Sequence, residues 1–266
     1  MGVTHQEHDG DSRALAFAGL LRRARLDRTL VLPMPGAPRT VQEGALAQVA
    51  LARLVGAPVP AGFKIGATGR RMQEYLGLSG PAAGFMEAGN VYRGSADLRF
   101  ASFIKPGVEC EVAVRLSRDL PFKAYALEDV ADAVGEVIAG VEIVENRYDD
   151  LRTLGTPTLI ADQVYHCAAV VGVGGEDWRG LDLGALRGRI SVDGVVRDQG
   201  VSSDLMGHPF ACLAWLASSE VAAAFGGLKA GQTVMLGSVT PPVWLDAPGE
   251  VVVEFEGLAP VRVGLA

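Results

Sequence analysis

The segment from Pro106 to Leu116 alternates between two kinds of side chain, which is the period-two pattern of a β-strand with two different faces. Valine and cysteine side chains fall on one face, and Glu109 and Glu111 fall on the other. Side chains two residues apart on a strand lie about 7 Å apart, so these carboxylates repel each other unless a cation or a base lies between them. The next residue on their face is Ala113, which favours an enclosed face.

A third carboxylate lies in a second apolar strand, predicted at residues 141–144. Glu142 and Glu145 fall on opposite faces there, so only one of them can share a cavity with the first pair. Three carboxylates suit Mg²⁺ or Mn²⁺, which prefer oxygen ligands and keep water molecules that a substrate can displace. Glutamates on a wet strand face are the common alternative, and the strand pattern alone favours that alternative over metal binding.

Composition restricts the class of protein. The 266 residues are 49% hydrophobic and 21% charged, with a formal charge of −7, and the basic residues are scattered. No basic patch is available for nucleic acid, so an anionic substrate would need a metal or one well-placed Lys or Arg. The three cysteines show no paired spacing and are expected to be buried thiols in a reducing cytoplasm. Neither a signal peptide nor a membrane span is expected.

The periodicity predicts an N-terminal helical region over residues 1–57 and a β-rich domain over residues 58–266. Residues 1–10 are expected to be disordered or loosely attached, with a helix from Asp11 or Ser12 to about Arg25. Thr40 and Glu43 form a capping box for a second helix that ends near residue 55. The other expected elements are helices at 70–76, 125–138 and 210–225, loops at 77–84 and 149–158, a hairpin turn at 193–194, and a last strand at 250–256.

Lys64 lies between Phe63 and Ile65 in a short predicted strand. A lysine in such a position is often a solvated side chain on an edge strand. The alternative is a lysine that faces a cavity lined with carboxylates. The local sequence does not separate these two interpretations.

Seven motifs, taken together, resemble the 2-keto-4-pentenoate hydratase and 4-oxalocrotonate decarboxylase branch of the fumarylacetoacetate hydrolase superfamily. They run from about residue 58 to the end of the chain, and their order and spacing are specific to the superfamily. The motifs are Gly62-Phe-Lys-Ile-Gly66, Gly107-Val-Glu-Cys-Glu-Val112, Val141-Glu-Ile-Val-Glu-Asn-Arg147, Leu159-Ile-Ala-Asp162, Ala214-Trp-Leu216, Leu228-Lys-Ala-Gly231 and Gly237-Ser-Val-Thr240.

The resemblance implies an α+β fold in which helices flank a rolled mixed sheet. It also implies Mg²⁺ or Mn²⁺ on Glu109, Glu111 and Glu142, chelated by a small 2-oxo acid. Lys64 matches the family's active-site lysine, which would hold the substrate carboxylate or move a proton. Ser238 and Thr240 match a hydroxyl-bearing loop that lines the site, so the resemblance implies that both bind the substrate and that Ser238 also takes part in catalysis. Relatives form dimers and larger assemblies, so a homo-oligomer is expected, in some cases associated with an enzyme of the same pathway.

Two positions depart from the pattern of the family. An acidic residue implicated in proton transfer is common where this chain has Ala82 and Ala83, and Gln163 replaces the usual Asn. Asp162 is our candidate for the missing proton carrier, with Glu74 and His166 as alternatives. Gln163 is expected to position water or substrate.

The resemblance leads to three functional hypotheses. The first is metal-dependent hydration of a 2-hydroxy-2,4-dienoate to a 4-hydroxy-2-oxo acid. The second keeps the site and changes the reaction to decarboxylation of a 2-oxo-3-enedioate or to carbon-carbon hydrolysis of an acylpyruvate. The third is an inactive subunit that binds an oxo acid or serves in assembly.

Overall fold

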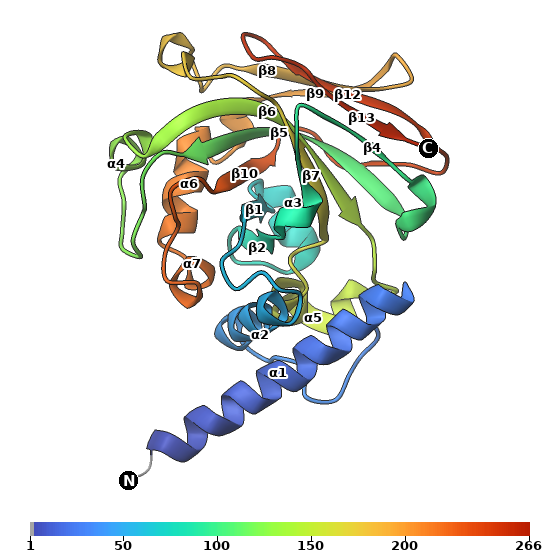
Figure 1. The fold of residues 1–266 in the computed structure, drawn as a ribbon, viewed down its shortest axis with the longest axis vertical. Helices are drawn as coiled ribbons and strands as arrows, with labels where there is room; N and C mark the ends of the chain where they lie inside the picture. The colour runs from blue at the N-terminus through green and yellow to red at the C-terminus, as the bar shows by residue number, and fades with distance from the viewer. Residues whose placement is uncertain (1–2) are drawn as a thin grey trace.

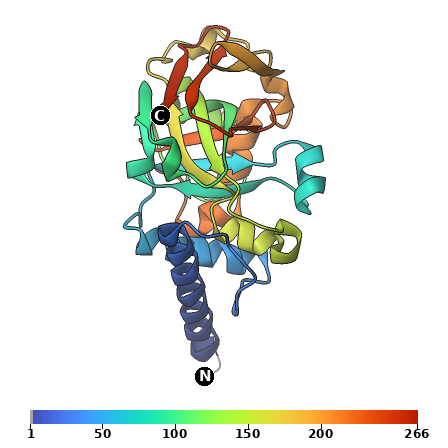
Figure 2. The ribbon, with the colours of Figure 1, turned by 90° about the vertical axis from the view of Figure 1, so that its right-hand side faces the viewer.

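The structure is a computed structural model that describes residues 3–266 (Figures 1 and 2). A strongly curled sheet forms the centre of the molecule, a second sheet covers its outer face, and helices close the opposite end (Figure 1). The helices are α1 (Val3–Asp27), α2 (Val41–Leu54), α3 (Arg70–Leu76), α4 (Leu127–Ala131), α5 (Leu151–Ala161), α6 (Pro209–Ala217) and α7 (Glu220–Ala224). The expected α+β fold is confirmed.

The curled sheet has eight strands in the order β2-β1-β10-β5-β6-β7-β3, and β11 pairs with β5. The pairs β1/β10 and β3/β7 are parallel and the others are antiparallel, so the sheet is mixed. Its strands are β1 (Gly62–Gly66), β2 (Ala82–Met86), β3 (Val91–Arg93), β5 (Pro106–Leu116), β6 (Val134–Glu145), β7 (His166–Val171), β10 (Thr233–Ser238) and β11 (Val243–Trp244).

The second sheet has five strands in the order β4-β13-β12-β8-β9. The predicted hairpin turn at Asp193 and Gly194 joins β8 to β9, and both residues have the positive φ that a tight turn requires. The strands of this sheet are β4 (Ser95–Leu98), β8 (Arg187–Val192), β9 (Val195–Val201), β12 (Gly249–Phe255) and β13 (Val261–Leu265).

Two apolar clusters lie on opposite faces of the curled sheet. Val108, Cys110 and Val112 of β5 belong to the main core, which also contains side chains of β8, β12 and β13. A smaller cluster lies on the inner face and consists of Met86, Ala113, Ile138, Ala169, Val171 and Met235. The alternation predicted for β5 is therefore confirmed, and the face that carries Glu109 and Glu111 continues into this enclosed inner cluster.

The N-terminal helices pack at one end of the curled sheet, and the first part of α1 projects away from the body (Figures 1 and 2). Gln48 of α2 is fully buried, and its amide donates hydrogen bonds to the carbonyl oxygens of Ala83 and Ile160. The Gln48 carbonyl accepts from the backbone N–H of Phe85. Because each polar atom of Gln48 has a backbone partner, this side chain ties α2 to β2 and α5. The division into regions 1–57 and 58–266 stays a prediction.

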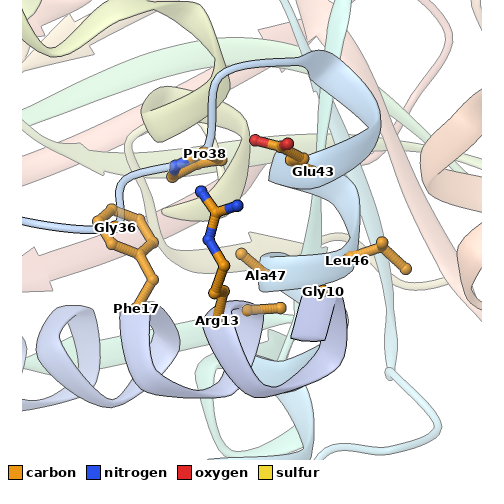
Figure 3. Close-up of a pocket in the computed structure, with 9 residues that line it drawn as sticks. Gly10, Arg13, Phe17, Gly36, Pro38, Glu43, Leu46 and Ala47 are labelled. Carbon is orange, nitrogen blue, oxygen red and sulfur yellow. The ribbon is translucent and has the colours of Figure 1, made fainter. Parts of the chain in front are cut away.

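A narrow pocket separates α1 from α2 and the loop before α2 (Figure 3). Its volume is ≈50 Å³, and Arg13, Phe17, Glu43 and Ala47 are among its lining residues. Ligand pockets in proteins usually measure about 300–1,000 Å³, so this pocket is too small for a substrate.

Several predicted elements were wrong. α1 begins at Val3, so residues 3–10 are helical and not disordered, although this first part of the helix projects from the body as loose attachment predicts; residues 1–2 lie outside the described part of the chain. The helix predicted at 125–138 stops at Ala131, because the apolar residues that follow form the start of β6. The helix predicted at 210–225 is interrupted at Ser218 and Ser219, and Ser219 caps α7. The loop predicted at 77–84 contains the start of β2, the loop at 149–158 contains most of α5, and β13 was missed.

Candidate active site

Three carboxylates meet on the inner face of the curled sheet. β5 and β6 pair so that Glu109 lies opposite Glu142 and Glu111 lies opposite Gly140. One carboxylate oxygen from each glutamate lies within 4.8 Å of the others, an arrangement that could hold a metal ion. Glu111 and Glu142 are fully buried, whereas Glu109 is half-buried. Glu145 points away from the cluster, as its place in β6 predicted, and accepts a hydrogen bond from the backbone N–H of Ile104.

Gly237 fixes one oxygen of this cluster. Its backbone N–H donates a 2.9 Å hydrogen bond to Oε2 of Glu111. An extra residue in β10 between Met235 and Ser238 shifts the register and turns this N–H toward β5. Gly237 has φ +114°, and a Cβ there would lie 2.7 Å from Cγ2 of Thr68. Only glycine therefore fits this position without a rearrangement of its neighbours.

Lys64 contacts the carboxylates from β1. It is buried, and its Nζ lies 3.3 Å from Oε1 of Glu142 and donates a 2.8 Å hydrogen bond to the carbonyl oxygen of Val164. β1 lies between β2 and β10, so Lys64 is on an interior strand. Of the two interpretations left open by the sequence, the solvated edge lysine is wrong.

The carbonyl that Lys64 contacts belongs to an unusual turn between α5 and β7. Gln163, Val164 and Tyr165 have φ values of 60°, 53° and 66°, which is the left-handed region that disfavours residues with a side chain. A Cβ at Gly84 would lie 2.5 Å from the carbonyl oxygen of Gln163, so β2 and this turn approach each other closely only because residue 84 is glycine.

His166 contacts the same glutamate oxygen as Lys64. Cys167 is an extra residue in β7, because Ile143 pairs with Ala168 while Val144 pairs with His166. Such a bulge re-aims the side chain beside it, and here it places His166 on the inner face with Glu142. Nδ1 of His166 lies 2.8 Å from Oε1 of Glu142, and its Nε2 is buried without a hydrogen-bond partner among the described residues.

Burial and mutual repulsion shift the pKa values of the cluster in different directions. Burial first, and then the charge of Glu142, raise the pKa of Glu109 to about 8. The same causes, together with the charge of Glu109, raise the pKa of Glu111. Burial acts in the same sense on Glu142, but Lys64 and the hydrogen bond from His166 outweigh it and lower the pKa of Glu142. Without a cation, the fold therefore disfavours the simultaneous ionisation of all three carboxylates.

A pH dependence of the metal-free protein follows. Between the ordinary carboxyl pKa of 4.5 and the value of about 8 in the fold, the folded state holds more protons on Glu109 than the unfolded state does. The free energy of unfolding therefore decreases as the pH rises through this range. We expect the Tm of EDTA-treated protein to fall between pH 5 and pH 8 in thermal scans, and added Mg²⁺ to raise it most at pH 8.

The variant Glu109→Gln is the control for this pH dependence, because its side chain does not titrate. Its Tm should depend less on pH over the same range, since other titrating groups are common to both proteins. A wild-type curve that matches the variant curve would contradict the raised pKa of Glu109.

A scan against family models matches residues 67–266 to the fumarylacetoacetate (FAA) hydrolase C-terminal family. The chain belongs to this family. It is 30% identical to a 2-keto-4-pentenoate hydratase of Burkholderia vietnamiensis, over 95% of this chain and 97% of the relative. It is 33% identical to a 2-hydroxyhexa-2,4-dienoate hydratase of Comamonas testosteroni, over 74% of this chain and 75% of the relative.

A solved structure has the same fold as this member of the fumarylacetoacetate hydrolase family. It is the 4-oxalocrotonate decarboxylase from Pseudomonas putida G7, complexed with magnesium and adipate. The TM-score is 0.86 at 23% identity, and the match covers 96% of this chain and 98% of the other. The rolled mixed sheet that the sequence motifs implied is thereby confirmed.

Two residues predicted for catalysis and binding lie in an ionic network behind the carboxylates. Asp162 is fully buried between Arg25 of α1 and Arg147, at 2.5 Å and 3.0 Å, and it also accepts a 2.7 Å hydrogen bond from Tyr148. The two arginines outweigh burial and lower the pKa of Asp162, so a proton is held weakly there. Gln163 accepts from Arg25 and donates to the carbonyl of Phe85. These contacts favour a supporting role for Asp162 and Gln163, and their predicted roles remain untested.

The predicted hydroxyl loop begins beside the carboxylates. Ser238 pairs with Glu111 across the β10/β5 ladder, but its hydroxyl lies 2.7 Å from the carbonyl oxygen of Thr240 and 3.2 Å from that of Cys110. Thr240 is buried, and its backbone N–H donates to the Ser238 hydroxyl. The hydroxyl of Ser238 thus holds the loop in shape in this conformation, and its contact with a substrate stays a prediction.

Strand pairing shows where an acidic side chain at position 82 would lie. β1 and β2 pair Lys64 with Gly84 and Gly66 with Ala82, so residue 82 lies on the strand face that Lys64 occupies. An acidic side chain at position 82 would therefore share the inner face with Lys64, and the alanine there is buried.

Arg25 and Arg147 received no role from the sequence. Arg147 ends one of the seven motifs, but nothing in the local sequence distinguishes it from an arginine on the protein surface. In the structure it is 2% exposed. Arg25 lies 137 residues from its partner Asp162, and no local pattern connects the two.

Proposed function

We propose that this chain is a divalent-metal-dependent hydro-lyase that adds water to a 2-hydroxy-2,4-dienoate of the 2-oxo-4-pentenoate type, giving a 4-hydroxy-2-oxo acid. The observation that carries the proposal is the cluster of Glu109, Glu111 and Glu142 with Lys64 against it. The relatives that match nearly the whole chain and bear the name of a hydratase support this reaction over the others.

The residues present fit Mg²⁺ or Mn²⁺. Oε1 of Glu111 and Oε2 of Glu142 are buried and have no hydrogen-bond partner among the described residues. Buried carboxylate oxygens are normally paired, so two unpaired ones beside a third carboxylate favour a bound cation. Glu109, Glu111 and Glu142 would hold it. The bound cation would supply Lewis-acid stabilisation of negative charge on the oxygens of a 2-oxo acid.

Lys64 is placed to hold or protonate the substrate. An ammonium group has three N–H donors, and the Val164 carbonyl and Glu142 account for two of them. The third is free to donate to a carboxylate or to transfer a proton. Apolar side chains of the inner cluster, among them Ala113 and Met235, adjoin the site and exclude water from this side.

The main alternative is decarboxylation of a 2-oxo-3-enedioate at the same site. Ala82 favours it, because strand pairing puts this alanine, in place of the acidic residue common in the family, on the strand face that Lys64 occupies. Hydrolysis of an acylpyruvate would use the same residues. An inactive subunit that binds oxo acids or serves in assembly is the alternative from another class, and the intact carboxylates and Lys64 argue against it.

We also propose a cytoplasmic homo-oligomer. Among the described residues, no helix is long and apolar enough to cross a membrane. Leu15, Leu20 and Leu26 of α1 are 52%, 43% and 65% exposed, which would suit contact with another subunit. Sedimentation of the purified protein measures the oligomeric state.

A substrate panel tests the proposed reaction. Purified protein with Mg²⁺ should remove the ultraviolet absorbance of 2-hydroxypenta-2,4-dienoate, and the product should contain one added water by mass. Removal of the metal with EDTA should lower the rate by at least about a thousandfold, since charge stabilisation of this kind contributes several kcal/mol. Turnover unchanged by the chelator would refute the metal-dependent mechanism, and release of CO₂ from an enedioate substrate would favour the decarboxylase.

A further inference from the structure

A second cavity lies where the end of α1 meets the edge of the curled sheet. Its volume is ≈380 Å³, which falls within the size range of small-molecule sites. Arg22, Arg25 and Arg28 line it from α1 and the residue after it, and Arg147 lines it from the end of β6. We call it the arginine cavity. Its other lining residues are Leu26, Val55, Glu87, Asn90, Ser102, Ile104, Glu145, Gln163, His166 and Cys167.

The arginines of this cavity are not all neutralised by the protein. Arg147 is paired with Glu145 at 3.1 Å, and Arg25 is paired with Asp162. Arg22 and Arg28 are both exposed, and within the described part of the chain neither has a carboxylate at ion-pair distance. Arg28 donates a 3.4 Å hydrogen bond to the carbonyl oxygen of Phe103. Two guanidinium groups therefore keep their charge available in a protein whose net charge is −7.

Glu87 is the lining carboxylate that has no salt bridge among the described residues. One carboxylate offsets at most one of the two charges of Arg22 and Arg28, so an excess of positive charge remains. An arginine fork matches the geometry of a carboxylate and forms charge-assisted hydrogen bonds with it. The excess charge therefore suits an anion with a planar, two-oxygen head group.

His166 separates the arginine cavity from the metal-site carboxylates. His166 forms a hydrogen bond with Glu142 of the carboxylate cluster, and His166 also lines the arginine cavity. Its Nε2 is buried and has no partner among the described residues.

We infer that the arginine cavity binds a small organic carboxylate next to the metal centre. The carboxylate has two possible sources with the same chemistry. It is either the distal carboxylate of a dicarboxylic substrate, which rests on the proposed function, or a separate organic acid that binds independently of turnover.

Calorimetric titration of EDTA-treated protein with adipate tests the inference. Adipate has carboxylates at both ends and no 2-oxo group, and without a metal it cannot bind by chelation. We expect measurable binding to the wild type, and a dissociation constant raised by at least about tenfold in the double variant Arg22→Gln/Arg28→Gln, because each lost charge-assisted hydrogen bond has that effect or more. Circular dichroism confirms that the double variant is folded.

Arg23→Gln is the matched control. Arg23 lies on the same helix, pairs with Asp27 outside the cavity, and has a side chain that is 75% exposed. Its substitution should leave adipate binding unchanged. The inference is overturned if the metal-free wild type shows no binding, or if the double variant binds adipate as well as the control does.

Measurements of KM distinguish the distal carboxylate of a substrate from a separate organic acid. If the cavity holds the distal end of the substrate, the double variant should raise KM about tenfold for a diacid dienoate and leave KM for 2-hydroxypenta-2,4-dienoate unchanged. If it holds a separate acid, KM should stay the same for both substrates. A protein without any hydratase or decarboxylase activity would refute the proposed function, whereas the calorimetric result would stand by itself.

Discussion

Glu109→Gln is expected to abolish turnover and to weaken Mg²⁺ binding by at least about a hundredfold. The substitution removes one of three ligand charges and keeps the volume of the side chain. It should not unfold the protein, because Glu109 is half-buried and its carboxylate repels the charges of the other two glutamates. In the metal-free state the variant should unfold at the same temperature as the wild type or a higher one. Calorimetric Mg²⁺ titration and thermal scans with EDTA measure the two effects.

Glu136→Gln is a suitable control for Glu109→Gln. Glu136 lies on β6, the strand paired with β5, and forms partly exposed ion pairs with Arg93 and Arg115 at 2.8 Å and 3.4 Å. Such pairs contribute about 0–1 kcal/mol, so activity and metal affinity should not change. Wild-type metal affinity in Glu109→Gln would show that the three carboxylates are not the metal site.

Lys64→Met is expected to lower kcat by about 10²–10⁴-fold and to leave Mg²⁺ affinity equal to the wild type or higher. Methionine keeps most of the length and volume of lysine, which limits the cavity that Lys64→Ala would create in this buried position. Loss of the ammonium group would remove the proposed donor to the substrate. It also removes a positive charge 3.3 Å from Oε1 of Glu142, and that charge opposes a bound cation.

The comparison of kcat with metal affinity distinguishes the roles of Lys64. If Lys64 only shaped the metal site, both quantities would fall together, and supplying saturating Mg²⁺ would restore turnover. If it contacts the substrate, as proposed, turnover stays low at saturating Mg²⁺. Recovery of kcat with excess metal would contradict the direct role.

Part of the carboxylate cluster could be predicted because the alternation of side chains along a strand can be seen in a short stretch of sequence. The period of β5 places Glu109 and Glu111 on one face, and the same alternation separates Glu142 from Glu145. The alternation of side chains along one strand does not show which strands are neighbours. The resemblance of the seven motifs to the family indicated that Glu142 joins Glu109 and Glu111. The register that brings Glu109 opposite Glu142 depends on pairing between segments that are over 30 residues apart in sequence.

Other features were decided by tertiary contacts that the sequence does not display. The apolar residues after Ala131 satisfy the spacing of a helix, but in the structure they are covered on both faces of β6, which favours a strand. Lys64 resembled an edge residue because the neighbours of β1 come from β2 and from β10, nearly 170 residues later. His166 reaches Glu142 through a bulge, and a shift of one residue in register has no compositional signature.

The left-handed turn at 163–165 connects the amino-terminal helix to the candidate active site. Residues with side chains in this backbone region cost of order 1–3 kcal/mol each, so the turn persists only where its surroundings hold it. Arg25 of α1 donates hydrogen bonds to the side chains of Asp162 and Gln163. The carbonyl oxygen of the next residue, Val164, accepts a hydrogen bond from the ammonium group of Lys64. A displacement of α1 would thus disturb the position of Lys64 through this one turn. The amino-terminal helix is in this way coupled to the three carboxylates by a chain of contacts that runs through Arg25, Val164 and Lys64.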